Sequence, residues 1–372
     1  MAVRHPGGAG GDAGSDAHRA VVQPVRAVPA VDERQGPAAR DPAGDADRGP
    51  KLEAGDRIRR GDGAKLGLTT WEAKTEPGEV IESNELGGPE NVPEARFPPP
   101  QPKEPWAVII GVHGMNDYAE AFYLAGPYWA SKGVTTYAYD ARGFGRSPNR
   151  GVWAGEDLMI DDLRTAVAVA RKKHPKALIA VVGESMGAAE AMVAFGERNA
   201  PDADRVVLCA PAVWGWTTLP SFYSFTLWTG AHTLPKKKVT PPRGVAPMPS
   251  DNMDMLRKVG RDKNMLFGTR IDAVYGLVKL MDEAAGDVGD IKAPVAFFYG
   301  QKDKVVPRNA ATIAVGRLPR GSRTAFYPDG YHMILRDTHA RVVWDDVLAF
   351  IKDPKAPLPS GAPPVPGPSK KR

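Results

Sequence analysis

Residues 183–187, Gly-Glu-Ser-Met-Gly, give the clearest indication of chemistry in the sequence. An apolar run at 178–182 precedes them, and an alanine-rich segment of helical character at 188–195 follows. A serine on such a strand-to-helix turn is lifted clear of the sheet, and the two glycines remove Cβ atoms that would clash where the chain reverses. The same pattern fits a serine that only caps the helix. Ser185 is therefore a candidate nucleophile whose role depends on its partners.

A serine nucleophile needs a base, and the base needs a third group that fixes its tautomer. His332 is the candidate base because it follows an expected strand at 324–327. Two other histidines also come after the serine, but His232 lies in an irregular region and His339 begins the last expected helix. On a strand-to-helix serine turn of this kind, the acid precedes the histidine in the chain and follows an earlier strand.

Asp303 is the candidate acid, on the loop after an expected strand at 295–299. Its alternative role is to cap the helix expected near Pro307. Asp329 is closer in sequence to His332, but Asp329-Gly330 is typical of a turn. The loop at 210–216 has no carboxylate that could take the same part.

Acyl transfer also needs donors for the developing oxyanion. One expected donor is the backbone N–H of Met186, which follows the nucleophile at a helix N-terminus. The other expected donor is the N–H of Met115, on the loop after the apolar run at 106–112. His113 on the same loop precedes the serine and sits in a tight turn, so we expect it to support the loop rather than to act as the base.

The elements that must position these residues alternate along the chain. Apolar runs of strand type occur at 106–112, 134–139, 178–182, 206–210, 295–299 and 324–327. Helical periods lie between them, and a closing helix carries Val343, Val347, Phe350 and Ile351 on one stripe. This alternation predicts an α/β fold with a mostly parallel sheet covered on both faces. Ligands in such folds bind beyond the carboxyl ends of the strands, where Ser185 would lie.

The chain of 372 residues divides by composition. Residues 1–62 are rich in Gly, Ala, Asp, Arg and Pro, and 354–372 are rich in Pro, so both ends are expected to be disordered. Residues 63–213 and 291–353 are expected to form the core. Residues 214–290 interrupt the alternation and are expected to form a helical cap, in which Trp214, Trp216, Phe222 and Tyr223 are candidate substrate contacts.

The composition argues against several other functions. A net charge of +5, with both signs mixed, gives no reason to expect a nucleic-acid partner. The single cysteine, Cys209, lies in an apolar run and excludes a disulfide within the chain. Residues 143–148 lack the third small residue of a dinucleotide loop, and no metal or nucleotide cofactor is expected. No signal peptide or membrane span is visible, so a cytoplasmic protein is expected.

Together these residues resemble the monoglyceride lipase and lysophospholipase branch of the α/β-hydrolases. The resemblance covers residues 66–352 and rests on four ordered motifs: His113-Gly114-Met115, the segment Asp140 to Ser147, the serine turn, and the pair Asp303 and His332. It implies that Asp140 to Ser147 shapes a turn, and that a helical cap encloses an apolar acyl channel. The chain departs from the family at Asn116-Asp117, where many members have Gly-Glu, and at Glu184, where histidine is frequent.

The expected activity is hydrolysis of lipid-like monoacyl esters, such as monoacylglycerols or lysophospholipids, through an acyl-enzyme. An acyltransferase, an amidase or a short-chain carboxylesterase would use the same triad, and a non-catalytic binding protein on this scaffold is the remaining alternative. The cap aromatics beside Lys236, Lys237 and Lys238 are compatible with peripheral contact to anionic lipid. The favoured interpretation, however, is a solvated basic loop over a buried aromatic core.

Overall fold

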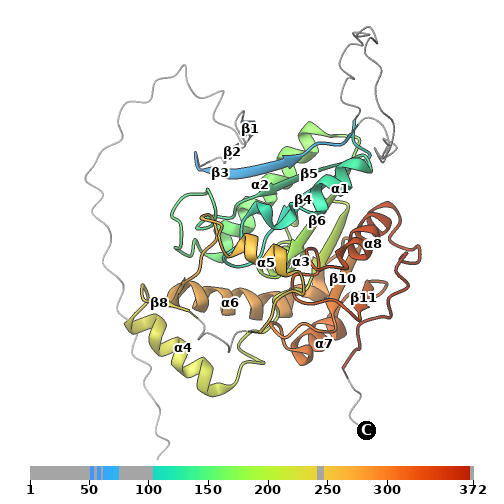
Figure 1. Cartoon of the computed structure of the whole chain (residues 1–372). Coiled ribbons are helices and arrows are strands. Elements are labelled where there is room, and N and C mark those ends of the chain that lie inside the picture. The colour runs from blue at the N-terminus through green and yellow to red at the C-terminus, as the bar shows by residue number, and fades with distance from the viewer. Residues whose placement is uncertain (1–50, 54–56, 60–61, 75–103, 241–246, 369–372) are drawn as a thin grey trace, which may run out of the picture. The chain divides into compact units, whose positions relative to one another are not determined.

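The computed structural model describes residues 51–53, 57–59, 62–74, 104–240 and 247–368. Residues 1–50, most of the expected disordered arm, lie outside this range, as do 369–372 of the expected tail. Among the described residues, nine strands form one sheet in the order β1-β2-β3-β5-β4-β6-β7-β10-β11. Figure 1 shows this sheet running through the core.

The sheet changes character along its width. At one side, β1 (Lys51–Glu53), β2 (Arg57–Arg59) and β3 (Lys65–Trp71) pair antiparallel, and β3 pairs antiparallel with β5. The remaining strands are parallel: β5 (Val134–Tyr139), β4 (Ala107–Val112), β6 (Leu178–Glu184), β7 (Arg205–Cys209), β10 (Val295–Gly300) and β11 (Arg323–Tyr327). β4, β5 and β10 are buried throughout, as expected of parallel strands covered on both faces.

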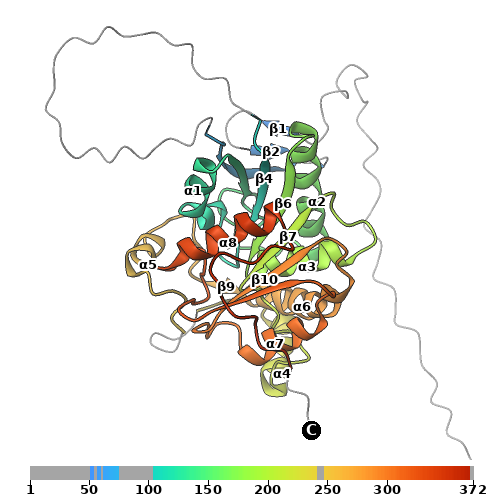
Figure 2. The same cartoon turned by 90° about the vertical axis from the view of Figure 1, so that its right-hand side faces the viewer.

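Helices cover both faces of the sheet (Figure 2). One face packs against the short helix η2 (Ala119–Phe122), α1 (Ala125–Ser131) and α8 (Ala340–Lys352). The other packs against α2 (Glu156–Lys173), α3 (Met186–Gly196), α6 (Ile271–Asp287), η3 (Val288–Asp290) and α7 (Arg308–Arg317). The α/β fold with a mostly parallel sheet is as the alternating pattern predicts.

The region expected to form a cap contains α4 (Ser221–Thr233), β8 (Lys238–Val239), α5 (Met253–Val259) and β9 (Thr269–Arg270). Two-residue strands β8 and β9 pair antiparallel, which the sequence did not suggest. α6 also falls within 214–290, but Leu280, Ala284 and Ala285 pack in the same core cluster as α3. The second half of α6, within the range expected for the cap, therefore packs on the core.

The two expected disordered ends need correction where they are described. Residues 51–53 and 57–59 form β1 and β2, so the end of the arm extends the sheet. Residues 354–368 pack along β11: the Phe326 N–H donates to the Pro363 carbonyl at 2.7 Å, and Val365 is buried. A proline-rich segment can cover an edge strand, because it accepts hydrogen bonds from that strand without requiring donors of its own.

Within the described residues, no helix is both long enough and apolar enough to span a bilayer.

Candidate active site

Ser185 occupies the turn between β6 and α3 in a strained conformation, with φ 56° and ψ −113°. Its N–H donates to the Cys209 carbonyl and its carbonyl accepts from the Ala212 N–H, each at 3.0 Å, so the end of β7 holds the turn. A Cβ on Gly183 would lie 2.5 Å from the Gly187 carbonyl oxygen, which explains the glycine there. Among the described residues, the Ser185 hydroxyl makes no capping bond to α3, contrary to the helix-cap alternative.

His332 lies between Ser185 and Asp303. Its Nε2 is 3.0 Å from the Ser185 Oγ, and its Nδ1 is 2.8 Å from the Asp303 Oδ2. The three side chains follow three different strands, β6, β10 and β11, at the carboxyl edge of the sheet. Both His332 and Asp303 are buried. In this arrangement the Nδ1–H donates to the carboxylate, which leaves Nε2 free to accept the serine proton.

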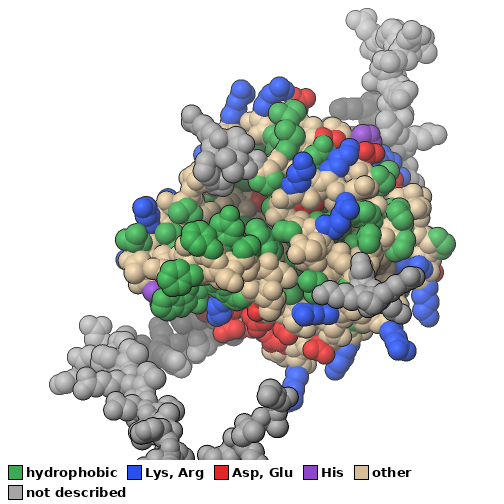
Figure 3. Space-filling view, turned by 90° about the horizontal axis from the view of Figure 1, so that it is seen from below, with side chains coloured by type: hydrophobic (Ala, Val, Ile, Leu, Met, Phe, Trp, Pro, Cys, Tyr) green, Lys and Arg blue, Asp and Glu red, His purple; other side chains and the backbone are tan. Residues whose placement is uncertain are grey.

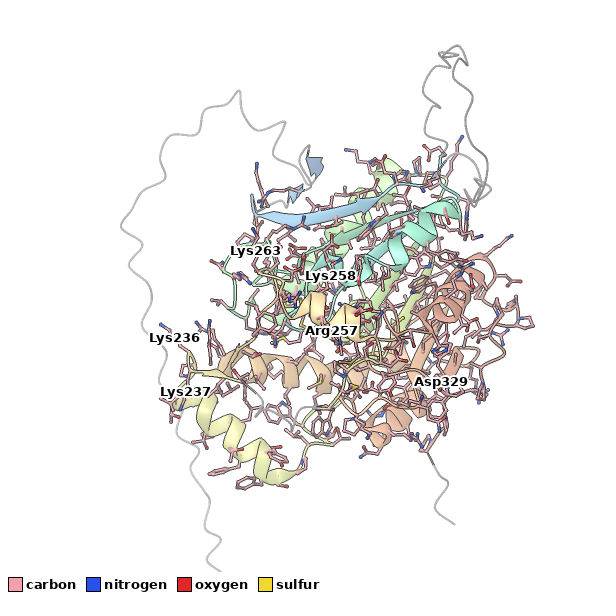
Figure 4. The ribbon with its side chains drawn as sticks, viewed as in Figure 1. Lys236, Lys237, Arg257, Lys258, Lys263 and Asp329 are labelled. Carbon is pink, nitrogen blue, oxygen red and sulfur yellow. The ribbon has the colours of Figure 1, made fainter. Side chains whose placement is uncertain are left out.

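Asp303 contacts His332 and does not cap α7, whose N-terminus has no side-chain capping bond among the described residues. Its Oδ2 accepts from His332, while its Oδ1 accepts from the N–H groups of Val305 and Val306 at 2.8 and 3.1 Å, just before α7. The backbone donors therefore fix the carboxylate that orients the histidine. Asp329, in contrast, lies at the surface and pairs with Lys302 (Figure 4).

The other histidines considered from the sequence, His113, His232 and His339, have a structural role or lie at the surface. His113 is fully buried, with Nδ1 2.8 Å from the Gly114 carbonyl oxygen, while its Nε2 accepts from the Ala141 N–H at 2.8 Å. Burial lowers its pKa and keeps the ring neutral. His113 thus supports the loop after β4, as predicted. His232 and His339 are exposed in α4 and at the start of α8.

Asp140 fixes the turn that follows β5. Its Oδ1 accepts from the Ala119 N–H at 3.0 Å, and its carboxylate pairs with Arg146 at 2.9 Å. The Ser147 hydroxyl donates to the Asp140 carbonyl at 2.5 Å. Burial opposes ionisation, but the hydrogen bonds from Arg146 prevail and lower the pKa of Asp140.

The two expected oxyanion donors lie on segments that meet at Ser185. Met186 is the first residue of α3, where backbone N–H groups have no acceptor within the helix. Met115 follows Gly114, and a Cβ on Gly114 would lie only 3.3 Å from the Ser185 Cβ. The loop after β4 is thus packed directly against the serine. Asn116 has φ 66°, a conformation that glycine adopts freely and asparagine tolerates, which accounts for the Asn in place of the family's Gly.

Three charged side chains that the sequence did not assign to the site form a buried cluster. Arg336 contacts the Asp117 Oδ2 at 2.6 Å and the Glu184 Oε2 at 2.8 Å. Both carboxylates stood out as departures from the family, without any indication of a shared partner. The signal available in the sequence was that Arg336 follows His332 by only four residues. Burial raises the pKa of Glu184, while Arg336 opposes that rise.

The loop after β4 is also bonded to the cap. The Asn116 side chain donates to the Thr269 hydroxyl at 2.7 Å, and its carbonyl accepts from the Leu266 N–H at 3.0 Å. The Tyr118 hydroxyl donates to Asp262 at 2.5 Å. The cap is therefore attached to the segment expected to bind the oxyanion.

A cavity of about 460 Å³ lies between α4 and α6. It is lined mainly by apolar side chains, among them Trp214, Leu219, Tyr223, Leu227, Val274 and Leu277. Trp214 lies two residues after Ala212, which bonds to the serine turn. Of the four candidate substrate contacts, the structure brings Trp214 and Tyr223 to this cavity. Trp216 instead packs on Tyr275, and Phe222 is 71% exposed.

Within the described part of the chain, no three His, Cys, Asp or Glu side chains are grouped so that they could hold a metal ion.

Comparison with known proteins identifies relatives of this chain. A family model described as serine aminopeptidase, S33, matches residues 103–339. A monoacylglycerol lipase of Mycolicibacterium smegmatis is 27% identical over 266 residues, which cover 67% of this chain and 89% of that protein. These matches confirm the resemblance predicted from the sequence.

Solved structures show the same fold at lower identity. The monoacylglycerol lipase of Paleococcus ferrophilus superposes with a TM-score of 0.59 at 16% identity, covering 77% of this chain and 98% of that one. A soluble variant of the monoglyceride lipase of Saccharomyces cerevisiae, in complex with a substrate analog, superposes with a TM-score of 0.62 at 14% identity. The match covers 83% of this chain and 95% of that one. The α/β-hydrolase fold is confirmed.

Proposed function

This chain belongs to the serine aminopeptidase S33 family and has the α/β-hydrolase fold, and from that premise we propose that it is a serine hydrolase of lipid-like monoacyl esters. The observation that carries the proposal is the position of His332, within hydrogen-bonding distance of both Ser185 and Asp303. Such a relay is what activates a serine hydroxyl, which is otherwise a poor nucleophile.

In the proposed reaction, the Ser185 Oγ attacks the ester carbonyl carbon while the His332 Nε2 accepts the hydroxyl proton. The Asp303 carboxylate accepts a hydrogen bond from the Nδ1–H and stabilises the imidazolium that forms. The N–H groups of Met115 and Met186 donate to the oxyanion. The protonated His332 gives its proton to the departing alcohol. Water then attacks the acyl-enzyme with His332 again as base, releasing the fatty acid and restoring Ser185.

The nature of the acyl group is inferred from the apolar cavity between α4 and α6. A cavity of about 460 Å³ lined by side chains such as Leu227 and Leu277 suits a hydrocarbon chain. The M. smegmatis relative and two of the solved structures are monoacylglycerol or monoglyceride lipases. The M. smegmatis relative favours monoacylglycerols over short-chain esters, and the apolar cavity also suits the acyl chain of a lysophospholipid.

The test is Ser185→Ala, with the exposed Ser221→Ala as a matched control. We expect Ser185→Ala to lower hydrolysis of a monoacylglycerol by at least about a thousandfold, and Ser221→Ala to leave it unchanged. A fluorophosphonate probe should label wild type and Ser221→Ala but not Ser185→Ala. Near-normal turnover by Ser185→Ala would refute the proposal. Failure of folded wild type to react with the probe would instead favour a non-catalytic binding protein.

A transferase, an amidase or a short-chain esterase would share the first half-reaction, so only the substrate and the acceptor distinguish them. Product analysis with competing alcohols separates transfer from hydrolysis. A panel of monoacylglycerols, lysophospholipids, short-chain esters and aminoacyl amides identifies the preferred class.

We further propose that the cap contacts anionic lipid surfaces. Phe222, Phe225 and Trp228 on α4 are each more than half exposed, contrary to the alternative of a buried aromatic core. Figure 3 shows hydrophobic side chains gathered on the face seen from below, where α4 lies in Figure 1. Lys236 and Lys237 follow the end of α4 (Figure 4). Aromatic side chains flanked by lysines suit the interface of an anionic bilayer.

Binding to vesicles of phosphatidylserine and phosphatidylcholine tests the contact. Acidic side chains also lie on this face (Figure 3), so insertion of the aromatics should contribute more than charge. We expect alanine at 222, 225 and 228 to reduce binding at least about tenfold, and glutamine at 236–238 to reduce it less. Unchanged binding in both sets would exclude cap docking, while hydrolysis of monomeric esters should be unaffected by either.

A further inference from the structure

Arg336 joins the three segments that carry the proposed catalytic groups. It lies on the loop between β11 and α8, four residues after His332, and its guanidinium contacts Asp117 on the loop after β4 and Glu184 at the end of β6. All three side chains are almost completely inaccessible, with exposures of 2%, 5% and 2% for Arg336, Asp117 and Glu184. One cation is thus bonded to the expected oxyanion loop and to the residue before Ser185.

A buried ion cluster of this kind is expected to contribute little to the stability of a fold. Desolvating buried ions usually offsets their attraction, and apolar replacements of similar volume are often no less stable. Here the cost is higher, because Glu184 Oε1 and Arg336 Nε have no hydrogen-bond partner among the described residues. One cation also faces two carboxylates, which leaves the cluster with one negative charge when all three groups are ionised. Such a cluster calls for a role other than stability.

The backbone around Arg336 is fixed as well. Its N–H donates to the Met333 carbonyl at 2.8 Å, and its carbonyl accepts from the Asn252 side chain at 2.9 Å. The guanidinium therefore sits at a fixed position relative to His332. Any movement of the oxyanion loop or of the serine turn away from His332 would break a buried ion pair, which is strongly unfavourable.

We propose that Arg336 and Glu184 are positioning residues for the proposed ester hydrolysis: Arg336 holds the oxyanion loop and the serine turn in register with His332, and the Glu184 carboxylate stabilises the imidazolium of His332. The inference rests on the proposed function. Charge of the imidazolium develops in the transition state, where a fixed buried carboxylate acts through a medium of low dielectric.

Several titratable groups interact with Glu184. Arg336, His332 and Asp337 come from the loop after β11, Asp117 from the loop after β4, and Cys209 from β7. His332 is also in direct contact with Asp303. Of the two carboxylates bonded to Arg336, Glu184 is the one adjacent in sequence to the nucleophile. A change at Glu184 therefore tests the effect of its charge on His332, whereas a change at Asp117 tests the positioning of the oxyanion loop.

The experiment compares Glu184→Gln, Asp117→Asn and Arg336→Lys with Glu190→Gln. Glu190 is a matched control because it is another fully buried glutamate, on α3, for which the described residues offer no hydrogen-bond partner. Glu184→Gln keeps the shape and an acceptor for Arg336 while removing the charge. Arg336→Lys keeps the charge and loses the guanidinium. Thermal unfolding selects the folded variants, and Glu184→Gln suffices if the others do not fold.

Two readouts are needed. For Glu184→Gln we expect kcat to fall about tenfold with KM little changed, and the acid limb of the kcat/KM profile to move down by roughly half a pH unit or more. Asp117→Asn and Arg336→Lys should lower kcat with a smaller displacement of the limb. The midpoint of an NMR titration of the His332 ring should also move to lower pH in Glu184→Gln, and this measurement needs no substrate. Glu190→Gln should change neither.

If the His332 ring and the pH profile are the same in Glu184→Gln, Glu190→Gln and wild type, the inference is wrong. That result leaves the proposed function intact, because the latter depends on Ser185→Ala. Conversely, a wild-type protein without esterase activity would refute the proposed function, while the NMR titration would still decide whether Glu184 acts on His332.

Discussion

The carboxyl edge of the sheet around Ser185 and the region expected to form the cap are built in opposite ways. At the edge, Ser185 is held in a strained turn by backbone hydrogen bonds to the end of β7, and a buried ion cluster lies beside it. In the cap, α4 has no buried residue among its thirteen, and its largest side chains face outward. Strain and buried charge persist only where the surroundings fix every atom, whereas an exposed helix needs few contacts.

This difference indicates a division of labour. Under the proposed function, the geometry at this edge determines whether an acyl group can be transferred, and it should tolerate little change. The cap should decide which acyl group enters and which surface is contacted, and its exposed positions should tolerate substitution. Four predictions test the two halves of this contrast, from the largest expected effect to the smallest.

Replacing the acid of the triad should have the largest effect. Asp303→Asn leaves His332 without a carboxylate partner and favours the wrong tautomer, so we expect kcat to fall by about a thousandfold or more. Asp329→Asn is the control, since Asp329 is exposed and bonded to Lys302. Steady-state hydrolysis of a p-nitrophenyl ester measures both. Equal losses in the two variants would mean that the acid is misassigned.

Glu190 makes the core beside the catalytic edge sensitive to pH. Burial, and secondarily Asp162, raises its pKa from 4.5 to about 8. Between these values the native state holds a proton that the unfolded state has lost. The contribution of Glu190 to the free energy of unfolding is therefore fully present below pH 4.5. It is lost as the pH rises to about 8, which lowers the free energy of unfolding by a few kcal/mol. Urea unfolding at pH 5 and 9 should show this loss in wild type but not in Glu190→Gln; parallel pH dependences would contradict the prediction.

Gly187→Ala tests how closely the serine turn is packed. Its Cβ would meet the carbonyl oxygens of Val112 and His113, so we expect the free energy of unfolding to fall by about 3 kcal/mol. Gly286→Ala is the control, because a Cβ at that exposed position of α6 meets nothing within 4 Å. It should stabilise the protein by up to about 1 kcal/mol through helix propensity. Denaturant unfolding measures both, and similar values would argue against a strained, closely packed turn.

Filling the cavity should change selectivity rather than catalysis. Leu227→Trp places a larger side chain in the space between α4 and α6, and we expect kcat/KM for a decanoyl ester to fall about tenfold relative to an acetyl ester. Phe225→Trp, on the exposed side of the same helix, should leave the ratio unchanged. If both esters are affected equally by Leu227→Trp, the cavity does not hold the acyl chain.

Much of the fold and of the candidate site could be predicted because the signals are local. Apolar runs flanked by turn residues gave every parallel strand, and the turn at 183–187 located Ser185. The order of Asp303 and His332 after later strands was enough to expect their meeting, since carboxyl ends of parallel strands share one edge. The antiparallel β1, β2 and β3 were missed. Three-residue strands such as β1 and β2, in a segment rich in charge and glycine, have no readable period.

The sequence by itself determined which residues could carry a serine hydrolase reaction and in what order along a parallel sheet they must come. Only the tertiary structure decided that Arg336 bonds to Glu184, 152 residues away, that the proline-rich end covers β11, and that the α4 aromatics face outward. The physical reason is the range of the forces involved. Turn geometry and apolar period act between neighbours in the chain, whereas buried ion pairs and covered edges depend on which distant segments packing brings together.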